Sequence, residues 1–287
     1  MRTAFADFPL ALAAFALLTG PALGDEPEAT AAKPVVAQMP RALLELPGIE
    51  DLVKYRPPVA SRVYATDGRL IGEFGINRVF VPIERIPKRV IDAFVAAEDQ
   101  RFYEHNGVDP VAMARAVLTN VRVGQGGRVV GGSTITQQVA KTFLLTSDRT
   151  VDRKVKEVVL ALRIEEALSK DKILELYLNE IYLGNRSYGV AAAAQTYFGK
   201  SLGELTVAEA AMIAALPKAP SATNPRRNPL LALERRDYVI DRMLEDKYIT
   251  HEQAAQAKHE PLNLHLPKPR VHPNTEYFVE EVRRSLV

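Results

Sequence analysis

The 287-residue sequence contains no cysteine and no tryptophan, and only 7% of its residues are aromatic. The absence of cysteine excludes thiol catalysis, disulfide bonds and metal sites built on thiolates. A large net charge is also missing, because 37 lysines and arginines face 35 acidic residues, a balance of +2. No overall field therefore points to nucleic acid as a partner. The hydrophobic share of 47% is enough for a sizeable core, in one large domain or in two lobes around a cleft.

The N-terminal residues differ from the rest of the chain. The apolar run at residues 8–18 is shorter than the roughly 20 residues that a membrane-spanning helix needs. A small-x-small pattern at residues 22–24 is typical of a cleavage site. Residues 1–24 are therefore expected to be a signal peptide or a membrane anchor, and either would export the rest of the chain. Residues 25–46, rich in Ala, Pro, Glu and Lys, predict a flexible tether.

After the tether, the patterns predict a small sheet followed by helices. Two β-prone runs, 61–66 and 69–74, flank Asp67-Gly68, a strong hairpin signal, and a third strand is expected near 78–82. Periodicity and capping residues predict helices over about 90–98, 110–121, 134–145, 151–168, 170–181, 190–198, 207–216, 230–245 and 250–259. A mainly α fold follows.

One carboxylate falls on the apolar face of the first of these helices. Ile91, Phe94 and Val95 form an apolar stripe at helical spacing, and the next position on it is Glu98. Asp99 points away, on the side of Asp92. An ionised carboxylate on an apolar face must have a partner, line a cleft or carry a raised pKa. Glu98 is therefore a candidate general base. The alternative is a glutamate at a helix C-terminus that simply reaches solvent.

Glu98 also begins the pattern Glu-Asp-x-x-Phe-x-x-His-x-Gly, formed by Glu98, Asp99, Phe102, His105 and Gly107. This pattern resembles the first signature motif of the peptidoglycan glycosyltransferases, the polymerase domains of class A penicillin-binding proteins and the monofunctional transglycosylases. The resemblance makes Glu98 the catalytic base and places Asp99, Phe102 and His105 at the substrate site. There His105 is expected to brace the loop after Glu98 rather than to bind a metal.

Residues 132–141, Gly-Ser-Thr-Ile-Thr-Gln-Gln-x-x-Lys, resemble the second motif of the same family. Thr134 and Gln137 are expected to form a capping box, and Ser133 can cap the helix as well. Hydroxyl, amide and ammonium groups along one helical stripe suit a sugar and a phosphate, and a solvated face is the alternative. The resemblance makes five side chains substrate contacts: Ser133, Thr134, Gln137, Gln138 and Lys141.

Arg153-Lys154-x-x-Glu157 resembles the third motif. Arg153 and Glu157 share a mixed stripe with Leu160 and Ile164, a pattern that suggests a cleft wall. The expected core face of this helix is Val155, Val158, Val159 and Leu162. The resemblance makes Glu157 the second acidic residue of the site, and Arg153 and Lys154 contacts of a diphosphate. Glu157 would orient the donor or hold a divalent cation, Mg²⁺ or Mn²⁺, at that diphosphate.

Residues 170–179 and 189–225 resemble the fourth and fifth motifs, so the resemblance extends over residues 46–287. It implies a mainly α, lysozyme-like, two-lobed glycosyltransferase domain over 47–265, with a small N-terminal β-hairpin. Residues 266–287 would be a connector toward a transpeptidase domain that is absent. The implied reaction polymerises lipid II into glycan strands, with inversion at the MurNAc C1 and release of undecaprenyl diphosphate.

The resemblance implies lipid II and the growing glycan strand as partners, at the outer, periplasmic face of the cytoplasmic membrane. The membrane surface and cell-wall synthesis proteins are further candidate partners, and nucleic acid is not expected. One alternative is a lysozyme-like hydrolase, since two carboxylates across a sugar cleft also describe a glycosidase. The set of lysines and arginines favours a diphosphate substrate instead. The other alternative is a non-catalytic module that binds cell-wall precursor, against which Glu98 and Glu157 argue.

Overall fold

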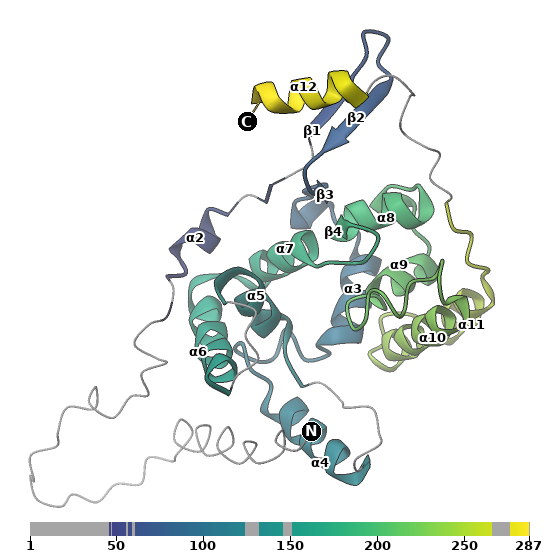
Figure 1. The fold of residues 1–287 in the computed structure, drawn as a ribbon. Coiled ribbons are helices and arrows are strands. Elements are labelled where there is room, and N and C mark those ends of the chain that lie inside the picture. The colour runs from purple at the N-terminus through teal and green to yellow at the C-terminus, as the bar shows by residue number, and fades with distance from the viewer. Residues whose placement is uncertain are drawn as a thin grey trace, which may run out of the picture.

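The computed structural model describes residues 46, 48–55, 57–58, 61–123, 132–145, 151–265 and 276–286. These residues are mainly helical and include two small two-stranded sheets, which confirms the predicted mainly α class with an N-terminal hairpin (Figure 1). The expected signal or anchor, nearly all of the tether and the first part of the connector lie outside the described residues. No helix among those described is both long and apolar enough to cross a membrane.

The hairpin forms where the sequence predicts it. Strands β1 (Ser61–Tyr64) and β2 (Leu70–Phe74) pair antiparallel around the Asp67-Gly68 turn. The third strand differs from the prediction, because β3 (Asn77–Arg78) pairs in parallel with β4 (Ser187–Tyr188) and not with the hairpin.

A buried ion pair explains the position of β3. The Arg78 guanidinium is buried and donates to Glu180 Oε2 at 2.6 Å and to the Pro58 carbonyl at 2.9 Å. A buried guanidinium needs such partners, so Arg78 ties β3 to the end of the helix that carries Glu180.

Apart from the last, the longer helices agree closely with the predicted ones; the last lies in the expected connector, where the sequence predicted no helix. The longer helices are α3 (Lys88–Glu98), α4 (Pro110–Val123), α5 (Ile135–Leu144), α6 (Val151–Ala167), α7 (Lys170–Glu180), α8 (Val190–Phe198), α9 (Val207–Ala214), α10 (Pro229–Glu245), α11 (His251–His259) and α12 (Glu276–Leu286). Shorter helices are α2 (Glu50–Val53) and the 3₁₀ turns η3 (Ile83–Arg85) and η5 (Leu202–Glu204). Capping boxes begin α5, α9 and α11, at Thr134, Thr206 and Thr250, because each threonine accepts a bond from a backbone N–H that the helix leaves unpaired.

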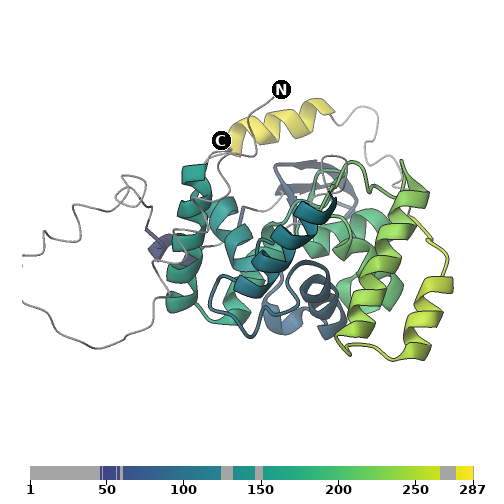
Figure 2. The same ribbon diagram turned by 90° about the horizontal axis from the view of Figure 1, so that it is seen from below.

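The core is arranged around α3. This helix packs against α9 and α10, while α5 packs against α6 and α7. Figures 1 and 2 place α6 and the α10–α11 pair on opposite sides of α3. The Phe94 ring is fully buried and meets the Tyr177 ring edge-on, with 6.1 Å between the ring centroids. The C-terminal end of α3 is thereby held between the two groups of helices.

Helix α7 supports the loop before α3. Glu175 Oε2 accepts a hydrogen bond from the Ile83 N–H at 3.1 Å. The Asn179 side chain both accepts from the Val81 N–H and donates to the Val81 carbonyl. Ser169 and Lys172 at the start of α7 have the Ser-x-x-Lys spacing of some acyl-serine enzymes. Here Ser169 Oγ accepts from the Lys172 backbone N–H, so the serine is a helix cap.

The buried face of α6 differs from the expected one. Glu157, Leu160, Ala161 and Ile164 are buried, whereas the four residues of the expected core face are only half-buried. The mixed stripe faces inward because α5 packs on that side of the helix and cations balance the charge of Glu157. Apolar periodicity alone predicted the wrong face.

Candidate active site

Glu98 is the last residue of α3 and lies half-buried at the wall of a cavity. Its Oε2 accepts a hydrogen bond from Gln138 Nε2 of α5 at 3.0 Å. Burial raises the pKa of Glu98, and the Gln138 bond and the charges of Arg235 and Lys218 oppose this rise. The neighbouring charge of Asp99 adds to it. A carboxyl group with a raised pKa at the wall of a cavity has the properties of a general base.

The cavity beside Glu98 has a volume of about 520 Å³ and is rich in cations. The cations that line it are Lys141, Arg153, Lys154, Lys218 and Arg235. Glu157 lines the same cavity, so the structure brings together both acidic residues predicted for the site. Five cations against two carboxylates suit an anionic ligand such as a diphosphate.

A second, smaller cavity of about 230 Å³ adjoins Glu98 on its other side. The two cavities share Ala97, Glu98, Ser133 and Tyr238. The smaller one is also lined by Gln100, Arg101, Asp109, Arg115 and Arg242. One carboxylate thus stands between two polar cavities, an arrangement that can hold two substrates with the base between them.

Glu157 is buried among positive groups. Lys154 Nζ lies 2.9 Å from Glu157 Oε2 and donates a second bond, of 2.8 Å, to Ser133 Oγ. Arg153 Nε lies 3.2 Å from Glu157 Oε1, at ion-pair distance but without hydrogen-bond geometry. Ser133 Oγ therefore accepts a hydrogen bond from Lys154, and Thr134 is the N-cap residue of α5.

The described side chains around Glu157 do not gather as a set of metal ligands. Both carboxylate oxygens of Glu157 face cations, which compete with a metal ion for the same lone pairs. Within the described part of the chain, no three His, Asp or Glu side chains come together as a set of ligands. A divalent cation at Glu157 would take most of its ligands from a substrate.

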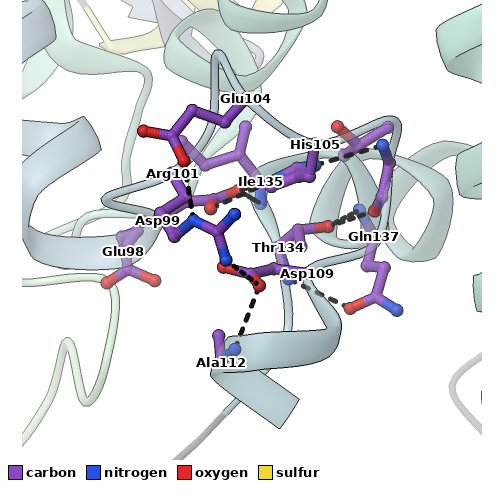
Figure 3. A network of polar contacts seen from close by, with 12 residues as sticks. Glu98, Asp99, Arg101, Glu104, His105, Asp109, Ala112, Thr134, Ile135 and Gln137 are labelled. Carbon is purple, nitrogen blue, oxygen red and sulfur yellow. Dashed lines mark hydrogen bonds and ion pairs between the residues drawn. The ribbon is translucent and has the colours of Figure 1, made fainter.

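A buried network of polar contacts lies next to Glu98 (Figure 3). Asp99 is 7% exposed, so it does not point to the outside as the helical stripe predicted. Its carboxylate binds His105 Nε2 at 3.0 Å and accepts the Ile135 N–H, at the start of α5, at 2.9 Å. His105 Nδ1 accepts from the Gly107 N–H, so the ring proton is on Nε2 and points to Asp99. As predicted, His105 braces the loop after Glu98.

The same network continues into the cap of α5. Thr134 Oγ1 donates to the Gly107 carbonyl at 2.6 Å and accepts from the Gln137 N–H. Phe102 is fully buried, and Lys170 Nζ lies 4.4 Å from the centre of its ring. Asp99 and Thr134 also border the smaller cavity, and Gln137 borders the larger one. Direct substrate contact by these side chains stays a prediction, and their hydrogen bonds show how α5 is held against Glu98.

Three polar residues of the larger cavity were absent from the prediction: Lys218, Arg235 and Tyr238. Lys218 directly follows Leu216-Pro217 of the fifth motif, to which only a shaping role was assigned. Arg235 and Tyr238 lie on α10, with the guanidinium carbon 4.3 Å from the centre of the phenol ring. The packing of α10 on α3 brings them to Glu98, and no local sequence signal carries that information.

Comparison with known proteins supports the family resemblance that the sequence motifs indicate. The sequence model of the transglycosylase family matches residues 67–244. Penicillin-binding protein 1A of Aquifex aeolicus is 51% identical over 240 residues, covering 83% of this chain and 32% of that protein. The Haemophilus influenzae protein of that name is 52% identical over 227 residues, covering 79% and 26%.

A solved structure is also similar. The crystal structure of penicillin-binding protein 1A from Haemophilus influenzae aligns with a TM-score of 0.46 and 34% identity, covering 79% of this chain and 24% of that one. The chain spans about a third of the length of the curated relatives it matches.

Proposed function

Since this chain belongs to the transglycosylase family, we propose that it is a peptidoglycan glycosyltransferase that polymerises lipid II at the outer face of the cytoplasmic membrane. One observation supports this most directly: Glu98, whose pKa is raised by burial, shares a cavity with five cations. The carboxylate suits proton removal from a sugar hydroxyl, and the cations suit a diphosphate leaving group.

In the proposed reaction, Glu98 removes the proton from the 4-hydroxyl of the acceptor GlcNAc. That oxygen attacks C1 of the donor MurNAc, the bond from C1 to the diphosphate oxygen breaks, and the configuration at C1 inverts. The proton ends on Glu98 and the bonding electrons leave with undecaprenyl diphosphate. The raised pKa makes Glu98 a stronger proton acceptor than an ordinary glutamate, which favours this step.

The cations act on the leaving group. Lys141 is exposed on the cavity, and its ammonium group is placed to meet a phosphate. Lys154 is held by Glu157 and Ser133, so its charge is fixed in position before a substrate binds. Charge fixed in this way stabilises the developing diphosphate at little reorganisation cost. Glu157 is thus proposed to position Arg153 and Lys154 as well as the donor.

The experiment that tests this function uses the purified full-length chain with lipid II in detergent, and separately with soluble, uncrosslinked glycan. We expect a ladder of glycan polymers from lipid II and no shortening of the soluble glycan. Shortened glycan without a ladder would support the hydrolase instead. Binding of lipid II without either product would support the non-catalytic module.

A further inference from the structure

A third cavity, of about 530 Å³, lies apart from Glu98. It is bordered by the turn before β4, by α8 and by the loop that joins α9 to α10. None of its residues borders the two cavities at Glu98, but the same α9–α10 loop reaches both places. Lys218 of that loop lines the catalytic cavity, and Arg226 and Arg227 line this one.

This third cavity is positively charged. Arg186, Arg226 and Arg227 line it, and among the described residues no aspartate or glutamate does. Arg226 is fixed, because its Nη2 donates to the Thr196 and His265 carbonyls at 2.6 Å each. Arg186 and Arg227 are exposed, and the described residues offer their guanidinium groups no ion pair or hydrogen bond. Two available guanidinium groups beside a fixed one suit an oxyanion.

The backbone that carries Arg186 is strained. Gly184, Asn185 and Arg186 have successive φ angles of +81°, +47° and +58°. Such angles are uncommon for residues other than glycine and persist only where the surroundings impose them. Asn224 Nδ2 donates to Asn185 Oδ1 at 3.0 Å and holds the turn in place. Strain of this kind is concentrated at binding sites.

Two buried donors at this cavity also have no acceptor among the described residues. They are Asn185 Nδ2 and Arg226 Nε. Buried donors are nearly always paired in folded proteins, so each unpaired one calls for an explanation. A ligand with several oxygen atoms, seated with small side-chain movements, would supply acceptors to both.

The remaining lining residues match a sugar. The amide of Gln195 and the hydroxyl of Ser221 can pair with sugar hydroxyls. The Tyr182 ring is 39% exposed and offers an apolar face to the C–H side of a pyranose. The volume falls within the range of sites for small ligands. A bare phosphate would use the arginines but would not engage Gln195, Ser221 or the Tyr182 ring.

We propose that this third cavity binds an acidic saccharide, namely a carboxylate-bearing unit of a glycan strand. This proposal rests on the proposed function, which supplies such a strand as its product. Binding there would hold the product to the same loop that carries Lys218 into the catalytic cavity.

The test is equilibrium binding to the full-length chain by isothermal titration calorimetry. The probe is the GlcNAc–MurNAc disaccharide bearing its stem peptide, which carries the free carboxylates of the strand, compared with neutral GlcNAc–GlcNAc and with inorganic phosphate. We expect saturable binding of the acidic disaccharide, weakened about tenfold or more in Arg186→Gln/Arg227→Gln, since each charged hydrogen bond contributes at least that factor. The exposed Arg163→Gln, on α6, is the matched control and should bind normally.

Equal affinity of the wild type and the double variant for the probe would overturn the proposal. Loss of binding in Lys141→Gln, with binding kept in the double variant, would also overturn it, because the probe would then occupy the catalytic cavity. Phosphate binding alone would overturn the saccharide class. Circular dichroism verifies that each variant is folded. Because the probe needs no turnover, arginine-dependent binding without polymerisation would refute only the proposed function. Polymerisation without such binding would refute only this inference.

Discussion

At the scale of single residues, the site depends on opposing effects on one carboxyl group. Burial raises the pKa of Glu98, while Gln138, Arg235 and Lys218 limit the rise. Glu98 and Gln138 come from different motifs, 40 positions apart in the chain, and meet because α5 is held against the end of α3. Sequence patterns identified both residues, but only the structure shows that they are hydrogen-bonded partners.

Replacing Gln138 by methionine should raise the pKa of Glu98 further, because the hydrogen bond that favours the charged form is lost. A general base must be ionised, so the acid limb of the kcat/KM profile should move to higher pH. The measurement is the pH dependence of polymerisation. Gln256→Met, at an exposed position on α11, is the control and should leave the limb in place. An unmoved limb in Gln138→Met would refute the link between this bond and the base.

Stability should also respond to Glu98. Its folded-state pKa is raised, so the folded protein holds this proton more tightly than the unfolded chain does. The contribution of Glu98 to stability therefore falls as the pH rises from the ordinary glutamate pKa through the raised one. Glu98→Gln removes this penalty, and thermal unfolding at neutral pH should show a variant at least as stable as the wild type. A lower melting temperature would contradict this reasoning.

At the scale of elements, the helix caps could be predicted from the sequence, whereas the buried face of α6 and the partner of Ser133 could not. The Thr134–Gln137 and Thr206–Glu209 boxes involve residues three apart, so the sequence alone shows them. The buried face of α6 depends on α5, and the partner of Ser133 is Lys154, 21 positions away. Such contacts depend on how helices pack, which apolar periodicity does not determine.

The buried network next to Glu98 depends most on the backbone conformation of Gly107. Its φ is +87°, and an added Cβ would lie 2.6 Å from the Ala161 carbonyl oxygen. Gly107→Ala should therefore destabilise the protein by about 2 kcal/mol or more. Chemical denaturation measures this directly, and polymerisation should fall with it, since the Gly107 carbonyl accepts from Thr134 at the start of α5.

The matched control is Gly203→Ala. No atom lies within 4 Å of an added Cβ there, so its free energy of unfolding should stay close to that of the wild type. Equal stability of the two alanine variants would show that the Gly107 backbone does not hold the network.

At the scale of the whole molecule, the cleft and the hairpin are separate parts. Residues of α3, α5, α6 and α10 line the larger cavity at Glu98, whereas α12 packs against β2 of the hairpin (Figure 1). An added Cβ on Gly72 would lie 2.4 Å from the methyl groups of Val279 on α12. The close approach of α12 to the hairpin therefore requires a glycine at this position.

Gly72→Ala should loosen α12 without changing the chemistry at Glu98. Hydrogen exchange in residues 276–286 should become faster, while the rate of polymerisation stays at the wild-type value. Trimming the opposing side chain in Gly72→Ala/Val279→Ala should restore much of the protection. Unchanged exchange in the single variant would show that this contact does not hold the helix.

The most direct test of the central claim compares Glu98→Gln with Glu166→Gln, an exposed position on α6. Lipid II binding and the rate of glycan formation are measured on the same preparations. The account predicts that Glu98→Gln binds lipid II like the wild type but forms glycan about 10²–10⁴-fold more slowly, the contribution typical of a general base. Glu166→Gln should be normal in both. Glycan formed by Glu98→Gln at the wild-type rate would contradict the assignment of Glu98 as the base.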